Sequence, residues 1–188
     1  ETLIPTGEGK AYGLELSWQK SWQRTQLNMA YTWSKSTRTF PGINNDETFL
    51  YRYDRRHVYH ISLLYKFGEN IEFSAQWNFG SGNPVTLANG QNYFYIDENG
   101  QRTLTLIFDA INNDKLPDYH RLDLGLNIYN THKWGESRLS IGLYNAYNRQ
   151  NPFYRDIQIE DVNNPNSLKY EQITILPILP SFSYNLSF

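Results

Sequence analysis

An alternation of apolar and polar residues with a period of two recurs in seven segments of this chain and constrains its fold more than any other feature. One phase of residues 12–18 reads Tyr-Leu-Leu-Trp, and one phase of residues 59–67 reads Tyr-Ile-Leu-Tyr-Phe. Because successive side chains of a strand point to opposite faces, this period predicts strands with one apolar face. Aromatic residues flank aliphatic ones on that face, which is the order that a bilayer selects. The pattern predicts strands that cross a membrane.

Composition agrees with membrane strands once the alternation is considered. Hydrophobic residues make up 39% of the 188 residues and mean hydropathy is -0.64, which would ordinarily indicate a soluble domain. A membrane strand presents only every second residue to lipid, whereas a spanning helix needs about 20 consecutive apolar residues. The sequence has no such run, but it has 15 Tyr and 5 Trp among an aromatic fraction of 16%. Aromatic girdles at the two membrane interfaces would explain this excess.

Charge and cysteine content narrow the possible partners. Net charge is -2, and the acids and bases are interspersed without a basic stripe, which excludes nucleic acid as a partner. The absence of Cys excludes disulfides and thiolate metal sites and is compatible with a bacterial outer membrane. Residues 1–10 lack the pattern of a signal peptide, although an exported protein requires one. We therefore expect the true N-terminus to lie elsewhere.

Seven membrane-crossing strands are predicted from the alternation. Their bounds are 11–20, 25–36, 57–67, 71–80, 120–130, 138–147 and 178–188. We expect every charge within these strands on the polar, lumen-facing phase, because Arg or Lys at the middle of the lipid face costs about 2 to 4 kcal/mol. The sixth strand fits least well, since Asn145 interrupts its apolar phase.

Short and long connections alternate between these strands. The short joins are 21–24, 68–70 and 131–137, and the long loops are 37–56, 81–119 and 148–177. All short turns would then lie on one rim and all long loops on the other, as periplasmic turns and extracellular loops do. Within the last loop, residues 153–159 and 168–175 are predicted to pair around a turn at 163–166. Seven strands would make too narrow a cylinder, so we expect further strands from outside residues 1–188 or from other chains.

Four motifs in a fixed order carry a family resemblance. They are YDRRH at 53–57, LPDYHRLD at 116–123, YNAYNRQNPF at 144–153 and PILPSFSYN at 177–185. Together they resemble the C-terminal third of TonB-dependent outer-membrane receptors of the Bacteroidetes type. The resemblance implies an all-β fold, an antiparallel transmembrane β-barrel of about 22 strands, to which this chain would contribute seven. A terminal Phe188 would serve as the barrel-assembly signal.

The resemblance also implies a function and partners. Such a receptor imports a scarce nutrient, for example a siderophore, cobalamin, a glycan or a peptide, through a barrel closed by an N-terminal plug domain. Its partners would be outer-membrane lipid, the plug, an inner-membrane energy-coupling complex and, in some cases, a surface lipoprotein lid. The plug and the segment that contacts the energy-coupling protein are not among residues 1–188, so import by these residues alone does not follow.

Polar residues where the long loops enter the strands are candidate clamps at the lumen or the rim. They are Asp54, Arg55, Arg56, His57, His120, Arg121 and Asp123. Arg121 and Asp123 are two apart on one face, so we expect them to pair with opposite charges on neighbouring strands or on a plug. We favour this structural role over direct contact with a ligand. His57 and His60 are three apart and face opposite sides, which argues against a shared metal ion.

The long loops are the expected place of ligand binding, because loops commonly carry recognition. The aromatic candidates for a ligand vestibule are Tyr93, Phe94, Tyr95, Phe153 and Tyr154, and packing between loops explains them equally well. Residues 97–100 and 109–114 are rich in oxygen ligands but lack the spacing of a calcium loop, so no metal or cofactor is predicted. His60 and Ser62 share a face without a third catalytic partner, so no enzymatic activity is predicted.

Two alternative functions remain open at this point. The chain could be a β-barrel scaffold or docking subunit of a larger outer-membrane complex that does not itself transport. It could also be a soluble lectin-like sandwich, in which the apolar phase of each strand would be buried inside the protein.

Overall fold

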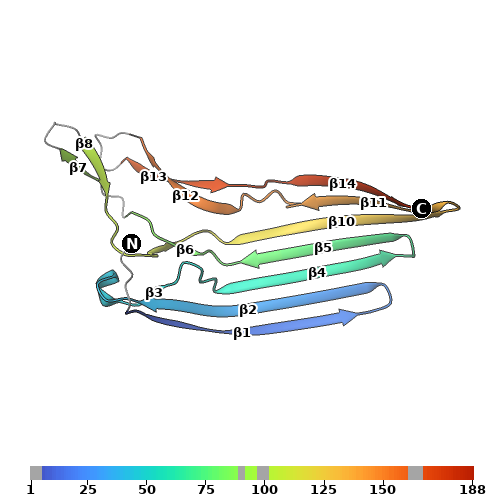
Figure 1. Cartoon of the computed structure of the whole chain (residues 1–188), viewed down its shortest axis with the longest axis horizontal. Coiled ribbons are helices and arrows are strands. Elements are labelled where there is room, and N and C mark those ends of the chain that lie inside the picture. Colours follow the sequence, from blue (N-terminus) through green and yellow to red (C-terminus); the bar gives the residue numbers. More distant parts are fainter. Residues whose placement is uncertain (1–5, 89–91, 97–101, 161–166) are drawn as a thin grey trace.

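The seven predicted strands all form, and they pair in chain order into one open antiparallel sheet (Figure 1). The computed structural model describes residues 6–88, 92–96, 102–160 and 167–188. The strands are β1 (Glu8–Ser21), β2 (Thr25–Thr39), β4 (His57–Phe67), β5 (Ile71–Gly80), β10 (Tyr119–His132), β11 (Gly135–Tyr144) and β14 (Leu179–Ser187). The predicted all-β antiparallel class is therefore confirmed. No helix among the described residues is long and apolar enough to cross a membrane.

Short elements fill the three long connections. They are η1 (Asn44–Asp46) and β3 (Phe49–Leu50) in the first, β6 (Pro84–Val85), β7 (Asn92–Ile96), β8 (Arg102–Leu106) and β9 (Asp114–Lys115) in the second, and β12 (Pro152–Ile159) and β13 (Leu168–Thr174) in the third. The predicted pairing within the last loop is present, since β12 and β13 form a two-stranded sheet. Its predicted turn at 163–166 lies outside the described residues.

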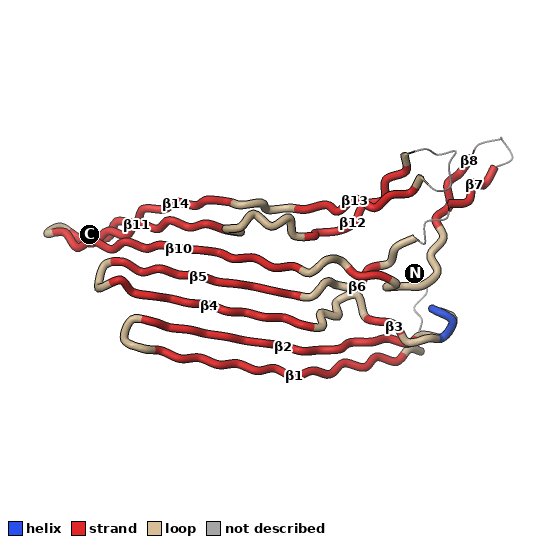
Figure 2. The backbone as a smooth tube through the Cα atoms, turned by 180° about the vertical axis from the view of Figure 1, so that it is seen from behind, coloured by secondary structure: helices blue, strands red, loops and turns tan. Residues whose placement is uncertain are grey.

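The connections divide the sheet into two rims (Figure 2). The turn rim carries the short joins between β1 and β2, β4 and β5, and β10 and β11. Phe188 follows β14 at the same rim. The loop rim carries the three long connections. This arrangement is the one predicted from the alternating lengths of the connections.

The sixth strand differs from its prediction at both ends. It starts at Gly135 and ends at Tyr144, earlier at each end than the predicted bounds 138–147, so the preceding turn is shorter than predicted. Asn145 and Asn148 both adopt left-handed backbone conformations, with φ of 52°. Asn accepts this conformation more readily than most residues, so the chain turns here instead of extending.

The strand register places the apolar residues of neighbouring strands side by side on what we call the outer face. One continuous row of this face runs through Leu27, Leu63, Ala75, Leu124 and Leu143. The opposite phase forms the inner face, where the adjacent row is Asn28, Ser62, Gln76 and Asp123. A slip of one residue would exchange the two faces, so the apolar face specifies the register.

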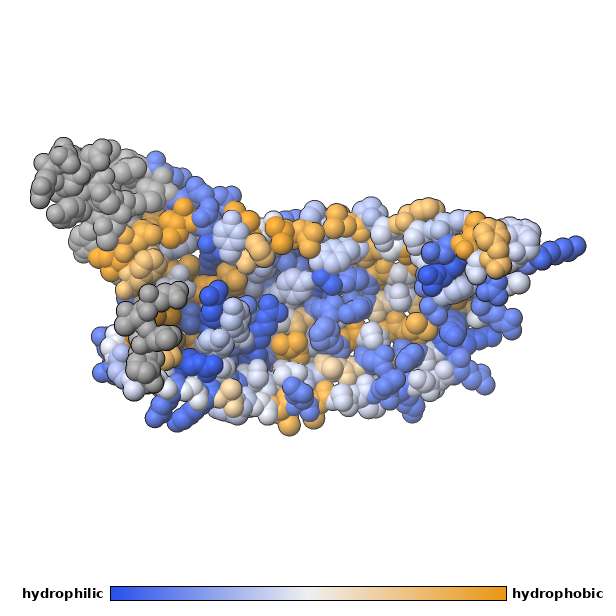
Figure 3. All heavy atoms as spheres, in the orientation of Figure 1, coloured by the Kyte–Doolittle hydropathy of each residue, from blue (hydrophilic) through white to orange (hydrophobic). Residues whose placement is uncertain are grey.

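The outer face is not covered by protein. Leu14 and Leu16 are each 55% exposed, and the buried apolar side chains of the described chain, Ala88 and Pro84, both lie in loop 81–119. A soluble sandwich would bury these leucines under a second sheet, whereas the other sheets of the described residues have two strands each and lie in the loops. The lectin-like alternative is therefore wrong. Figure 3 shows hydrophilic and hydrophobic side chains interspersed over the middle of the face that it presents.

Two lysines depart from the predicted segregation of charge. Lys20 pairs with Leu27 and Lys35 pairs with Tyr12, so both lie on the outer phase. The prediction that every strand charge faces the lumen is wrong for these two residues. Lys20 lies next to the end of β1 and Lys35 lies in the last third of β2. A long aliphatic stem can follow the apolar surface from these positions while the ammonium group reaches the interface.

The sheet is open at both edges. Among the described residues, β1 pairs with β2 and β14 pairs with β11, and the two edge strands do not pair with each other. The backbone groups on their free sides require partners in a bilayer, because lipid offers no hydrogen bonds.

Candidate functional site at the loop rim

The first two long loops are joined by side chains of Asn. Asn44 in η1 accepts a hydrogen bond from the Ile111 amide at 2.7 Å and donates one to the Ile111 carbonyl at 3.1 Å. Asn112 donates from its side chain to the Leu50 carbonyl at 2.6 Å. These bonds connect residues more than sixty positions apart, so loop 81–119 is held against loop 37–56.

The second and third loops are joined by an ion pair and a phenol. Arg155 in β12 donates to the carboxylate of Asp114 at 2.6 Å. Tyr170 in β13 donates its hydroxyl to the Ala88 carbonyl at 2.8 Å. Burial raises the pKa of Tyr170, which keeps the hydroxyl protonated as a donor. All three loops therefore belong to one connected cap.

The oxygen-rich residues 109–114 of loop 81–119 take part in these contacts. Asp109 accepts a hydrogen bond from the side chain of Asn113 at 2.6 Å, and Asp114 pairs with Arg155. Asn113 also exchanges two hydrogen bonds with the backbone of Leu87. Within the described part of the chain, no three acidic or His residues are grouped as metal ligands. The second segment considered, 97–100, lies outside the described residues.

A hollow of about 610 Å³ lies among the three loops. This volume is within the range of pockets for small molecules. Its lining comprises Arg38, Phe40, Ile43, Phe49, Tyr51, Arg52, Pro84, Val85, Thr86, Leu87, Ile111, Asn112, Tyr154 and Arg155. Of the aromatic vestibule candidates, Tyr154 lines the hollow, and the ring of Phe153 lies 5.5 Å from that of Tyr154. The side chains of Tyr93, Phe94 and Tyr95 lie outside the described part of the chain.

The predicted clamp at 54–57 fastens the first loop to its neighbours. Asp54 is 3% exposed, accepts a hydrogen bond from the Ser36 amide at 2.5 Å and pairs with Arg56 at 3.4 Å. Arg55 donates to the side chain of Asn83 at 2.8 Å. The segment thus lies between β2 and the start of loop 81–119, which positions one wall of the cap.

Arg121 and Asp123 pair with each other at 2.8 Å, whereas partners on neighbouring strands or on a plug were expected from the sequence. Residues two apart share a face of the strand, and the long Arg side chain reaches its neighbour along that face. The guanidinium also lies 4.0 Å above the ring of Tyr144. The second carboxylate oxygen of Asp123 accepts a hydrogen bond from the Asn145 amide at 3.0 Å. This pair therefore fixes the turn that follows β11.

Two Asn residues of this rim were not predicted from the sequence. Asn145 is fully buried, and its side chain bonds to both the amide and the carbonyl of Arg149. Asn151 accepts from the His120 amide at 3.0 Å and donates to the His120 carbonyl at 2.9 Å, so its side chain imitates a neighbouring strand. The motif from 144 to 153 contains both residues. The high content of Asn and Arg in this motif was the sequence signal for a turn held by side-chain hydrogen bonds.

His57 and His120 lie at the loop rim, one of the two positions considered for them, and their side chains are on the outer face. His57 pairs in register with Trp33, and its ring is 2.9 Å from the Tyr31 hydroxyl. His120 pairs with Phe79 and lies 2.7 Å from the Tyr147 hydroxyl. Both histidines therefore belong to the aromatic band at the loop rim.

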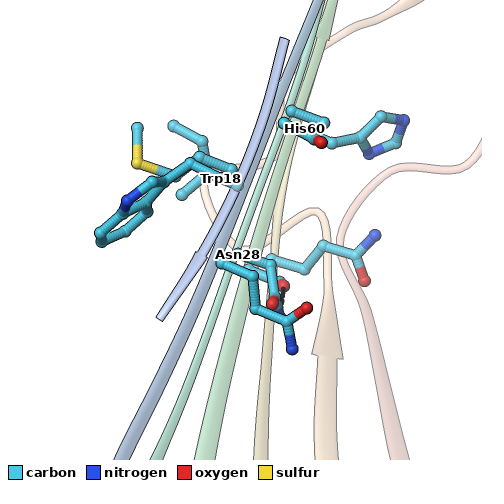
Figure 4. Close-up of a pocket in the computed structure, with 10 residues that line it drawn as sticks. Trp18, Asn28 and His60 are labelled. Carbon is cyan, nitrogen blue, oxygen red and sulfur yellow. Dashed lines mark hydrogen bonds between the residues drawn. The ribbon is translucent and has the colours of Figure 1, made fainter. Parts of the chain in front are cut away.

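A second, smaller hollow of about 260 Å³ is lined by residues of β1, β2, β4 and β5 from both faces of the sheet. Figure 4 shows Trp18 and His60 pointing away from opposite sides of the sheet. Ser62 accepts a hydrogen bond from Asn28 at 3.2 Å, and no hydrogen bond links His60 to Ser62 in the described chain. At the turn rim, Phe188 is 93% exposed and its ring lies 5.7 Å from that of Trp134.

Comparison with known proteins gives one match. A family model described as TonB-dependent receptor-like, beta-barrel, matches residues 2–146. No curated protein and no solved structure matches.

Proposed function

The chain belongs to the TonB-dependent receptor-like β-barrel family, and from this premise we propose that it is the C-terminal part of the barrel of a receptor that imports one scarce nutrient. The family consists of outer-membrane transport receptors and not of enzymes. The nutrient is a siderophore, cobalamin, a glycan or a peptide. The Bacteroidetes type is supported by the four motifs described above.

The convergence of three loops on one hollow carries this proposal. The hollow opens among loops that are tied to each other by Asn44, Asn112 and the Arg155–Asp114 pair. A docking scaffold needs an exposed surface, whereas a receptor for a solute needs a concave site held in a fixed shape. The loop rim has such a concave site, and its shape is fixed by contacts between the loops.

The two free edges of the sheet and its polar inner face support the remaining partners of this proposal. Further barrel strands pair with β1 and β14, and a plug domain contacts the inner face. Through that plug the receptor is coupled to the inner-membrane energy complex. A glycan or peptide importer would add a surface lipoprotein lid over the loops.

Removing one wall of the hollow is expected to reduce uptake by about tenfold or more, since each 1.4 kcal/mol of lost binding energy is a factor of ten. Residues 86–113 are replaced by an Asn-Gly turn, because Val85 and Asp114 are paired residues in neighbouring strands. The measurement is growth of a receptor-deficient strain carrying the variant, in media limited separately in iron, cobalamin, glycan or peptide.

A shorter deletion is the matched control. Residues 93–105 are replaced by the same turn between the paired Asn92 and Leu106, which leaves the lining of the hollow in place. We expect a smaller loss of uptake, and its size reports the contribution of Tyr93, Phe94 and Tyr95. If the longer deletion left growth unchanged in all media but released a co-purifying outer-membrane subunit, the scaffold function would replace the import function.

A further inference from the structure

The hollow among the three loops has an unbalanced positive charge. Its lining contains Arg38, Arg52 and Arg155 and no Asp or Glu. Arg155 is neutralised by Asp114, which lies outside the lining. Neither Arg38 nor Arg52 has a carboxylate within ion-pairing distance in the described part of the chain. Two guanidinium groups therefore have no counter-charge among the residues that the structure describes.

Arg38 is held in a defined position, and some of its hydrogen-bond donors are unused by described residues. Its guanidinium lies 4.2 Å from the ring centroid of Tyr51, which fixes one face of the group. One terminal nitrogen donates to the Thr37 carbonyl at 2.8 Å. The same nitrogen also donates to the Ser36 hydroxyl at 3.4 Å, and the N–H groups on Nε and on the other terminal nitrogen form no hydrogen bonds with described residues. Because a guanidinium has five donors in a planar fork, the remaining ones suit a carboxylate or a similar planar anion.

Rings and aliphatic groups surround these charges. Phe40 and Phe49 are in contact, with ring centroids 6.2 Å apart, and both line the hollow with Tyr51 and Tyr154. Ile43, Val85, Leu87 and Ile111 complete the apolar part of the lining. An ionic ligand without an apolar body would leave this surface in contact with water, and a neutral polar ligand would leave the two cations unpaired.

The hollow is also located above the lumen. Arg38 continues the inner phase of β2 through Ser34 and Ser36, and it pairs in register with Phe49. The Arg38 side chain therefore faces the side of the sheet along which a solute would pass, not the lipid side.

We propose that this hollow binds a small organic anion with a ring-containing body, its negative group on Arg38 and Arg52 and its ring among Phe40, Phe49, Tyr51 and Tyr154. The inference names the ligand class of the proposed import function and rests on it for its physiological meaning. Binding itself is measurable separately from import. The same site discriminates against neutral oligosaccharides and against cationic peptides, because like charges at a binding site oppose association.

The probe for this class is pyranine, a planar aromatic trisulfonate that stays in water and does not enter bilayers. Its fluorescence anisotropy is measured against the intact receptor in lipid nanodiscs. The combined variant Arg38→Gln and Arg52→Gln is expected to raise the dissociation constant by about tenfold or more, since it removes two charge-assisted contacts. The control is Arg24→Gln, which removes the same charge at the turn rim, and its affinity should equal that of the unmodified receptor.

The salt dependence and a neutral probe complete the test. Affinity for pyranine should fall as salt is raised from low concentration, because screening weakens exposed charge pairs. Equal affinity of the Arg38/Arg52 variant and the unmodified receptor, or tighter binding of maltohexaose than of pyranine, would refute the anionic ligand class. The import function would survive that result if the deletion of residues 86–113 still abolished uptake. Correct folding of each variant is checked by its resistance to unfolding in detergent before heating.

Discussion

Replacing Leu124 by Arg is expected to destabilise the folded barrel by about 2 to 4 kcal/mol, the cost of a cation at the middle of the lipid face. Leu124 is on the outer face of β10, between Ala75 on β5 and Leu143 on β11. The apolar row offers no carboxylate to pair with the guanidinium. The measurement is a urea titration of the receptor in lipid vesicles, followed by the loss of the heat-modifiable folded band.

The matched control carries the same charge on the other face. Asn127 is three residues further along β10 on the inner phase, where its side chain donates to Glu72 at 3.3 Å. Asn127→Arg places the guanidinium beside that carboxylate, so we expect stability close to that of the unmodified receptor. Equal destabilisation by the two substitutions would mean that both faces have the same surroundings, which would contradict a lipid-facing outer surface.

Replacing Asp123 by Ala is expected to destabilise the loop rim by about 2 to 3 kcal/mol, because it removes charge-assisted hydrogen bonds from partly buried groups. The carboxylate holds both Arg121 and the Asn145 amide, and the two charged side chains are 22% and 24% exposed. The loss should appear as faster hydrogen exchange at the Asn145 amide together with a lower urea midpoint.

Asp123→Asn separates the two contacts of this carboxylate. Its amide oxygen can still accept from the Asn145 amide, but the ion pair with Arg121 is lost. We expect the Asn145 amide to keep most of its protection against hydrogen exchange. The urea midpoint should fall less than in Asp123→Ala. If Asp123→Ala left the exchange rate of the Asn145 amide unchanged, the pair would not fix the turn after β11.

The strands were predictable because a membrane imposes a simple pattern. A period of two, aromatic ends and alternating loop lengths together determine which residues face lipid and which rim carries the loops. The bounds of β4 and β5 agree with the predicted 57–67 and 71–80. The end of β11 was not predictable in this way, because left-handed Asn145 and Asn148 end the strand within a stretch that retains β-forming tyrosines.

The positions of the histidines follow from the same period. His57 is two residues before Tyr59, and His120 is two residues before Leu122, so each shares the phase of an outward residue. The signal for their outer position is therefore present in the sequence, although a rim motif full of charges favours a lumenal interpretation.

The contacts of the cap at the loop rim, unlike the strands, could not be predicted from the sequence pattern. The contact between Asn44 and Ile111 joins residues 67 positions apart, and that between Tyr170 and Ala88 joins residues 82 apart. No local periodicity encodes such pairs, since they depend on how three irregular loops meet in space. Loop length predicted that the loops would be important, but it did not predict the hollow or its uncompensated arginines.

The account depends above all on lipid surrounding the outer face, and a scan of spin labels along β4 tests this most directly. Single labels are placed at positions 60–65 of the receptor in lipid vesicles, and collision rates with oxygen and with a water-soluble nickel chelate are measured. We predict oxygen maxima at Ile61 and Leu63 and oxygen minima at Ser62 and Leu64, with a period of two. Oxygen accessibility that is uniformly low at Ile61 and Leu63, or maximal at Ser62 and Leu64, would contradict the account.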